Sequence, residues 1–111
     1  MAKLILMFKD QVVNEFPFFK ASMTIGRKPE NNIQIDNLAV SGNHAKIDKT
    51  GSKFILTDLQ STNGTFALIQ GKKVVNLKRD EAPLLGKGII GLGREVTDDS
   101  PVAIHYSIAL I

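Results

Sequence analysis

The apolar residues of this chain recur at every second position or form short solid runs, and nowhere do they sustain the 3.6-residue period of an amphipathic helix. Ala45 and Ile47 alternate with polar neighbours, and after the turn Thr50-Gly51-Ser52 the run 53–59 is again short and largely apolar. Because alternate side chains of a strand line the same face of a sheet, this pattern predicts two paired strands. The chain is expected to be all-β.

The remaining apolar runs are equally short and are separated by turn residues. Pro17 interrupts one run and suits an edge strand, while Asp80-Glu81-Ala82-Pro83 and 97–101 are typical of connections. Roughly ten strands with turn signals about every 8–12 residues favour a β-sandwich or barrel. We therefore expect a single all-β domain over residues 1–111. The further runs are 4–8, 12–19, 22–25, 33–35, 65–69, 72–77, 84–92 and 102–110.

Composition excludes several classes of protein. Hydrophobic residues make up 43% of the chain, which is enough for a folded core and argues against disorder. There is no cysteine, so disulfides, thiolate zinc sites and cysteine nucleophiles are excluded. The run 4–8 is too short for a signal sequence or a membrane span, and we expect a cytoplasmic protein. The net charge of +3 favours anionic partners without specifying one.

Two short motifs match functional signatures but lack the context that those signatures need. Gly86-Lys87-Gly88-Ile89-Ile90-Gly91 has the spacing of a dinucleotide-binding loop, but the two isoleucines and the absence of a following helix favour glycines within a strand. Asn63-Gly64-Thr65 has the form of an N-glycosylation site, but Asn-Gly is also a favoured tight turn between strands. We expect no nucleotide, no metal and no other cofactor.

Three segments combine residue types that bind phosphate and peptide backbone. They are Thr24-Ile25-Gly26-Arg27, Ser41-Gly42-Asn43-His44 and Ser61-Thr62-Asn63-Gly64-Thr65-Phe66. Arginine offers a planar fork of donors that matches a phosphate, and hydroxyls with the amides of glycine turns can complete an anion pocket. Asparagine both donates to and accepts from a peptide backbone. Loops at one end of a rigid sandwich can hold such groups together.

The order and spacing of these segments resemble those of the forkhead-associated (FHA) domain. The resemblance spans roughly residues 3–110 and implies a β-sandwich of about eleven strands that binds phosphothreonine peptides through loops at one end. The matching residues are Gly26-Arg27, Asn32-Ile33-x-Ile35, Ser41-x-x-His44, Asp58-Leu59-x-Ser61-Thr62-Asn63-Gly64-Thr65-Phe66, and Leu84 with Gly88-Ile89-Ile90-x-Leu92-Gly93.

The resemblance implies four contact residues. Arg27 and Ser41 would contact the phosphate, and Thr62 would add a contact to the phosphothreonine. Asn63 would hydrogen-bond the main chain of the peptide beside it. The implied partner is a protein phosphorylated by a Ser/Thr kinase, and the chain would act as a signalling or assembly adaptor, as a whole protein or as part of a larger one.

Supporting roles and departures from the family pattern follow from the same resemblance. Gly26 and Gly64 would permit turns, and His44 would brace the loop that carries Ser41. Gly42 stands where the family usually has arginine, which removes one positive charge near the pocket. A second Asn-Gly of the family is represented by Gln70-Gly71, after a longer intervening segment.

Selectivity beyond the phosphothreonine is expected from the loops beside Ser41 and after Asn63-Gly64, which in the family often read the third residue after the phosphothreonine. None of these residues is charged, so an aliphatic side chain is expected there in preference to aspartate or lysine, unless Leu68 and Ile69 point into the core. The candidate specificity residues are Ala39, Val40, Gly42, Leu68, Ile69 and Gln70.

Other classes of function fit the sequence less well. Ser41, His44 and Asp58 have the residue types of a catalytic triad, but Ser41 and His44 are so close in sequence that a bracing role is favoured, and no enzyme is expected. Nucleic-acid binding is disfavoured because lysines are scattered and aromatic residues are few. An FHA-like scaffold with a phosphate-independent protein interface, or weak nucleic-acid binding, remains the alternative. No membrane partner is expected.

Overall fold

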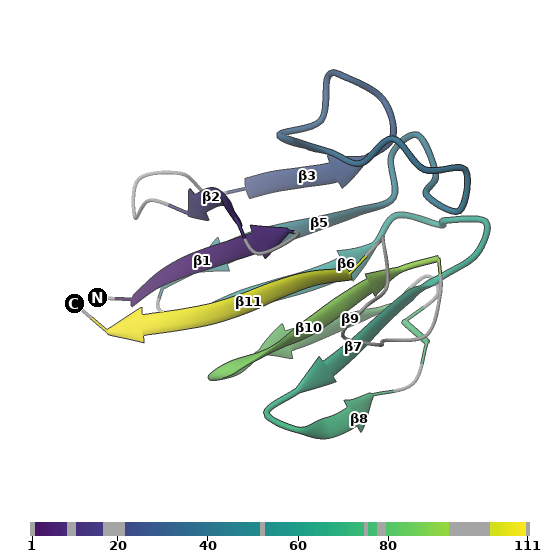
Figure 1. Cartoon of the computed structure of the whole chain (residues 1–111). Coiled ribbons are helices and arrows are strands. Elements are labelled where there is room, and N and C mark those ends of the chain that lie inside the picture. Colours follow the sequence, from purple (N-terminus) through teal and green to yellow (C-terminus); the bar gives the residue numbers. More distant parts are fainter. Residues whose placement is uncertain are drawn as a thin grey trace.

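Two β-sheets pack face to face in this computed structural model, which describes residues 2–8, 11–16, 22–51, 53–74, 76–77, 80–93 and 103–110 (Figure 1). The six-stranded sheet has the order β2-β1-β11-β10-β7-β8, and the five-stranded sheet has the order β4-β3-β5-β6-β9. The predicted β-sandwich is confirmed. The strands are β1 Ala2–Phe8, β2 Gln11–Phe16, β3 Ser22–Gly26, β4 Ile33–Gln34, β5 Ala45–Thr50, β6 Lys53–Asp58, β7 Thr65–Ile69, β8 Lys72–Val74, β9 Glu81–Leu84, β10 Lys87–Leu92 and β11 Ala103–Leu110.

The core lies between the two sheets and follows the period-two pattern of the strands. In the hairpin of β5 and β6, Ile47 lies opposite Leu56 in register, and both side chains are fully buried. Leu4 and Leu6 of β1 and Ile104 of β11 supply the facing side chains of the other sheet. Burial of each of these side chains contributes roughly 1.5–3 kcal/mol, so the pairing of apolar faces holds the sandwich together.

One predicted connection and the bounds of two predicted strand runs are wrong. Residues Glu81–Leu84 form strand β9. Pro83 is tolerated there because β9 lies at the edge of its sheet and, among the described strands, pairs only with β6. The predicted run 84–92 is therefore divided between β9 and β10. Within the described part of the predicted run 72–77, the strand covers Lys72–Val74. Pro17 and the predicted connection 97–101 lie outside the described residues.

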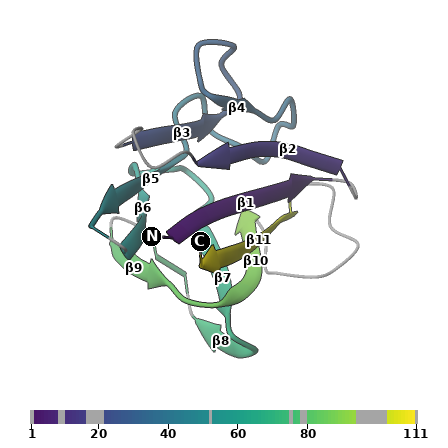
Figure 2. The same cartoon turned by 90° about the vertical axis from the view of Figure 1, so that its left-hand side faces the viewer.

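Three connections meet at one end of the sandwich, the right-hand end in Figure 1. They are residues 27–32 between β3 and β4, residues 35–44 between β4 and β5, and residues 59–64 between β6 and β7. The last of these crosses from the five-stranded to the six-stranded sheet. Ala2 and Leu110 are register partners at the opposite end, which faces the viewer in Figure 2. Among the described residues, no helix has the length and apolarity needed to cross a membrane.

Candidate functional site

The loop that carries Arg27 and the loop that carries Ser41 are joined through their backbones. The amide of Arg27 donates to the Ser41 carbonyl at 2.9 Å, and the amide of Lys28 donates to the Gly42 carbonyl at 3.2 Å. Gly26 makes this approach possible, because a Cβ atom there would lie 2.2 Å from the Gly42 carbonyl oxygen. The two loops therefore form one unit.

A buried asparagine fixes the same pair of loops. The Nδ2 group of Asn31 donates to the Gly42 carbonyl at 2.7 Å and to the Lys28 carbonyl at 2.9 Å. Asn31 is 8% exposed, so its side-chain amide makes these bonds away from solvent, where they are costly to lose. The position of the Ser41 loop is thus set by side-chain and backbone contacts together.

The third loop is closed around the carboxylate of Asp58, which lies at the end of β6 and is 3% exposed. Asp58 accepts from the Ser61 hydroxyl at 2.5 Å, the Ser61 amide at 3.1 Å and the Thr65 hydroxyl at 2.6 Å. The Ser61 oxygen in turn accepts from the amide of Gly64 at 3.0 Å. This buried network leaves the intervening Thr62 and Asn63 exposed at the tip.

The tip of the third loop contacts the Ser41 loop directly. The Thr62 amide donates to the Ser41 Oγ atom at 3.0 Å, and the Asn63 side-chain amide donates to the Ala39 carbonyl at 3.1 Å. Because Ser41 Oγ accepts one hydrogen bond here, its hydroxyl hydrogen remains for donation to a ligand. The four residues assigned to ligand contact, Arg27, Ser41, Thr62 and Asn63, thus lie on three connected loops.

His44 lies fully buried beneath these loops and joins two of them. Its Nδ1 atom accepts from the Ser41 amide at 3.0 Å, and its Nε2 atom lies 2.8 Å from the Gly64 carbonyl oxygen. An amide nitrogen can only donate, so Nδ1 carries the lone pair and Nε2–H donates to Gly64. Burial lowers the pKa of His44 despite the carbonyl of Gly64 and the charge of Asp58, which both raise it.

The exposed groups at this end suit an anionic ligand with a peptide backbone. Arg27 and Lys28 are exposed, and the partly exposed Ser41 lies on the adjoining loop. The side chain of Lys28 lies against Gly42, where an added Cβ atom would be 2.9 Å from the lysine Cε atom. Lys28 therefore places a cation beside the position at which the family pattern has arginine. The sequence interpretation missed this residue because only the folded loops bring Lys28 and Gly42 together.

The predicted position of a specificity loop after Asn63-Gly64 is wrong. Leu68 and Ile69 belong to β7, which runs from the three loops to the opposite end of the sandwich (Figure 1). Ile69 points into the core with 8% exposure, whereas Leu68 lies on the outer face of the sheet. Gln70 follows at that far end, where its amide donates to the Lys87 carbonyl at 3.0 Å.

In the loop that carries Ser41, apolar exposure is also distributed differently from the expectation. Val40 is 1% exposed and belongs to the core, while Ala39 and Gly42 are partly exposed. Leu38 instead is 88% exposed and directly precedes Ala39, whose carbonyl binds Asn63. Such exposure of a leucine is a signal that only the structure supplies.

The residue types of a catalytic triad do not form a triad here. Ser41 Oγ accepts from the Thr62 amide, and the two nitrogens of His44 bind the Ser41 amide and the Gly64 carbonyl. The Asp58 carboxylate binds Ser61 and Thr65. This is not the serine–histidine–aspartate relay that nucleophilic catalysis needs. In the described part of the chain, no group of three histidine, aspartate or glutamate side chains is placed to hold a metal ion.

The FHA domain model matches residues 23–93, which include all three loops, most of β3 and all of β4 to β10. The chain belongs to the FHA domain family. A curated relative is the transcriptional regulatory protein EmbR of Mycobacterium tuberculosis, 41% identical over 49 residues. Those residues are 44% of this chain and 13% of EmbR, so this FHA chain spans a small part of its relative.

Solved structures show the same fold at low sequence identity. The FHA-1 domain of Mycobacterium tuberculosis Rv1747 has a TM-score of 0.72 and 14% identity, covering 98% of each chain. EmbR in complex with a low-affinity phosphopeptide has a TM-score of 0.61 and 24% identity over 96% of this chain and 24% of EmbR. An FHA domain from work on phosphothreonine-dependent FHA interactions has a TM-score of 0.64 and 23% identity, covering 99% and 96% of the two chains.

Proposed function

We propose that this FHA domain is a binding module that recognises phosphothreonine in partner proteins. The observation that carries the proposal is the junction of three loops, in which Arg27, Ser41, Thr62 and Asn63 lie on one connected and partly exposed surface. Members of the same family are known in complexes with phosphopeptides and in phosphothreonine-dependent interactions, which supports the same use here.

Each group has a chemical role in this proposal. Arg27 grips the phosphate with its planar fork, and the Ser41 hydroxyl donates a further hydrogen bond. Lys28 supplies the second cation, in place of the arginine that the family usually has at the position of Gly42. Asn63 holds the peptide backbone, and Thr62 contacts the phosphothreonine. Donors without an activated nucleophile suit binding, and we propose no enzymatic activity.

Peptide selectivity is assigned to the exposed part of the loop that carries Ser41. Leu38 and Ala39 offer an apolar surface beside Asn63, so we expect an aliphatic residue of the peptide to be preferred there. This assignment replaces Val40, Leu68 and Ile69, which point elsewhere. The partner is a substrate of a Ser/Thr kinase in the cytoplasm, and the module acts as an adaptor in signalling or assembly.

We propose residues 1–111 as the extent of the module, beyond the matched residues 23–93. β1 and β11 lie in the middle of the six-stranded sheet, where β11 pairs with both β1 and β10. Their side chains Leu4, Leu6 and Ile104 are fully buried. The core therefore extends beyond the residues that the family model matches.

The test is binding of an oriented phosphothreonine peptide library, followed by titration of a selected peptide into wild type and Arg27→Ala. Charge-assisted hydrogen bonds contribute roughly 1.5–3 kcal/mol each, so Arg27→Ala should weaken binding by about two decades. Arg27→Lys should restore part of the loss because lysine keeps the charge but not the fork. Lys28→Ala should weaken binding by about ten-fold or less.

Matched peptides complete the test. The unphosphorylated peptide should not bind, and a phosphoserine peptide should bind several-fold more weakly than the phosphothreonine peptide, since one buried methyl contributes about 0.8 kcal/mol. Lys53→Glu, an exposed change on β6, is the charge control. Equal affinity of wild type and Arg27→Ala, with both variants folded, would show that the pocket is assigned to the wrong place.

A further inference from the structure

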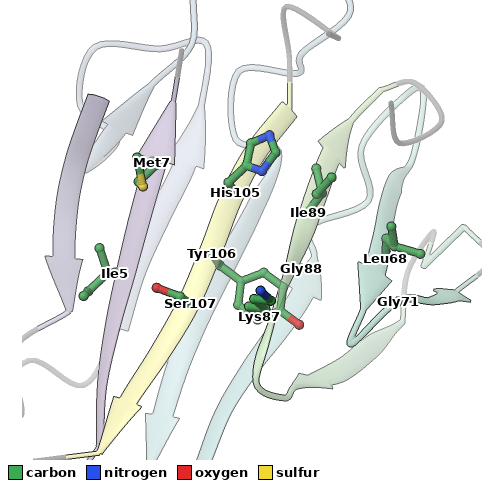
Figure 3. A pocket seen from close by; sticks show the side chains of 10 residues that line it. All are labelled: Ile5, Met7, Leu68, Gly71, Lys87, Gly88, Ile89, His105, Tyr106 and Ser107. Atoms are coloured by element: carbon green, nitrogen blue, oxygen red, sulfur yellow. The ribbon is translucent and has the colours of Figure 1, made fainter. Parts of the chain in front are cut away.

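A groove of about 400 Å³ lies on the outer face of the six-stranded sheet (Figure 3). We call it the sheet groove; among its lining residues are Ile5, Met7, Leu68, Lys87, Ile89 and His105, from β1, β7, β10 and β11. None of the residues of the three loops lines it. The sheet groove is therefore a second surface, separate from the proposed phosphopeptide site.

The sheet groove is apolar where a solvated sheet face is normally polar. Met7, His105, Ile89 and Leu68 are successive register partners across β1, β11, β10 and β7, so their side chains form one row. Met7 is 36% exposed, and Leu68 is partly exposed. Figure 3 shows these four side chains in a line across the sheet. Ile89 is already buried at 8% exposure, so Met7 and Leu68 present the apolar surface of this row that a partner would cover.

The floor of the sheet groove is shaped by Gly88 and Tyr106. An added Cβ atom at Gly88 would lie 2.7 Å from the Tyr106 ring, so the glycine lets the ring lie across β10. The Tyr106 hydroxyl donates to the Leu85 carbonyl at 2.9 Å, which fixes the ring. The groove is thus formed before any partner arrives.

The strands under the sheet groove restrict the conformation of an occupant. β1, β7, β10 and β11 each pair on both sides, so no edge is free to accept an added strand. The occupant must bind through side chains. Four strands span roughly 14 Å across the sheet, and two turns of an α-helix span roughly 11 Å, so the apolar side of a helix fits the row.

The positive charge of Lys87 in the sheet groove indicates which kind of helix would bind there. Lys87 and His105 of the sheet groove are exposed, and no carboxylate is among the lining residues that the structure describes. In a two-fold pair of copies, Lys87 of one copy would meet no carboxylate among the described lining residues of the other. A helix that carries glutamate or aspartate beside its apolar side complements Lys87 instead.

We propose that the sheet groove docks an acidic amphipathic helix of a partner protein. Aliphatic side chains of this helix cover Met7 and Leu68, and a carboxylate pairs with Lys87. Because the three loops lie at the end of the sandwich and the groove lies on a sheet face, the domain can hold this helix and a phosphopeptide together.

The experiment is selection from a phage-displayed library of helical peptides of about 18 residues, with the full chain as bait. Selected peptides are then titrated into Leu68→Thr and Lys87→Glu, with Leu85→Thr and Lys53→Glu as matched controls at exposed residues that do not line the groove. We expect enriched sequences to combine acidic and aliphatic residues, with affinity reduced about ten-fold by each groove variant and unchanged by the controls.

Separate readouts distinguish this proposal from the proposed function and from self-association. Arg27→Ala should bind the selected helices like wild type, and Leu68→Thr should bind a phosphothreonine peptide like wild type. No enrichment, enrichment of basic helices, or affinities insensitive to both groove variants would overturn the proposal. A dimer in sedimentation velocity that Leu68→Thr dissociates would overturn it in favour of a second copy.

Discussion

Ser41 shows how a small side chain can organise a binding surface. Its amide is held by His44, its carbonyl by the amide of Arg27, and its Oγ atom by the amide of Thr62. With these three bonds made, the hydroxyl hydrogen is the donor that remains. A ligand therefore meets a group whose orientation is already set, and less conformational entropy is lost on binding.

His44 should make the stability of the domain depend on pH. Its pKa in the folded protein lies below the ordinary value of 6.5, because burial disfavours the charged imidazole. Below about pH 6.5 the unfolded chain therefore binds more protons than the folded one, and the free energy of unfolding decreases as pH falls toward the lower, folded pKa. Above about pH 6.5 this contribution is fully present.

The measurement is thermal unfolding of His105→Gln, which leaves His44 as the only imidazole of the chain. The midpoint should fall between about pH 7 and pH 5.5, and NMR should show the His44 ring titrating below its ordinary range. Ligand is left out because the phosphate itself titrates near pH 6. A midpoint that stays constant over this interval would contradict the buried, neutral imidazole.

At the scale of elements, the loops are positioned by close backbone contacts, and glycine is required at specific points. Gly26→Ala would place a Cβ atom 2.2 Å from the Gly42 carbonyl oxygen, a backbone atom that moves only with its loop. We expect a loss of roughly 1–3 kcal/mol in the free energy of unfolding and about ten-fold weaker phosphopeptide binding.

Gly42→Ala is the matched control in the facing loop. The three atoms nearest to its Cβ atom would all belong to the flexible side chain of Lys28, at 2.9–3.2 Å, so its free energy of unfolding should stay near that of wild type. Chemical denaturation of both variants measures the difference. Equal stability of the two variants would mean that the approach of the loops is less tightly held than the contacts indicate.

The strands were predictable where local pattern decides, and the loops were not. The hairpin of β5 and β6 follows from alternation and the Thr50-Gly51-Ser52 turn. From the sequence alone, Pro83 indicated a turn. Its place on an edge strand could not be predicted, because the edge position of β9 depends on how strands distant in sequence pair. Val40 is buried although it lies in a loop, since burial there depends on packing between segments far apart in sequence. Lys28 against Gly42 arises in the same way.

At the scale of the whole molecule, the terminal strands β1 and β11 contribute buried side chains to the core. A fragment of residues 23–93, the part matched by the family, lacks Leu4, Leu6, Ile104 and Tyr106. Each buried side chain contributes roughly 1.5–3 kcal/mol, and together they approach the 5–15 kcal/mol that stabilises a typical domain. We expect this fragment to show no cooperative unfolding transition by circular dichroism, whereas residues 1–111 should show one. A cooperative transition in the fragment would place the domain boundary nearer to the matched residues.

The pairing of Ala2 with Leu110 at the end opposite the three loops has a practical consequence. A biotin tag or a fluorescent protein joined to either end is attached on the side of the sandwich that faces away from Arg27 and Ser41. On a biosensor chip, a chain captured by either end presents the three loops to the flowing solution. Phosphopeptide affinities measured with the two orientations should therefore agree, and attaching both ends at once should leave the loops just as accessible.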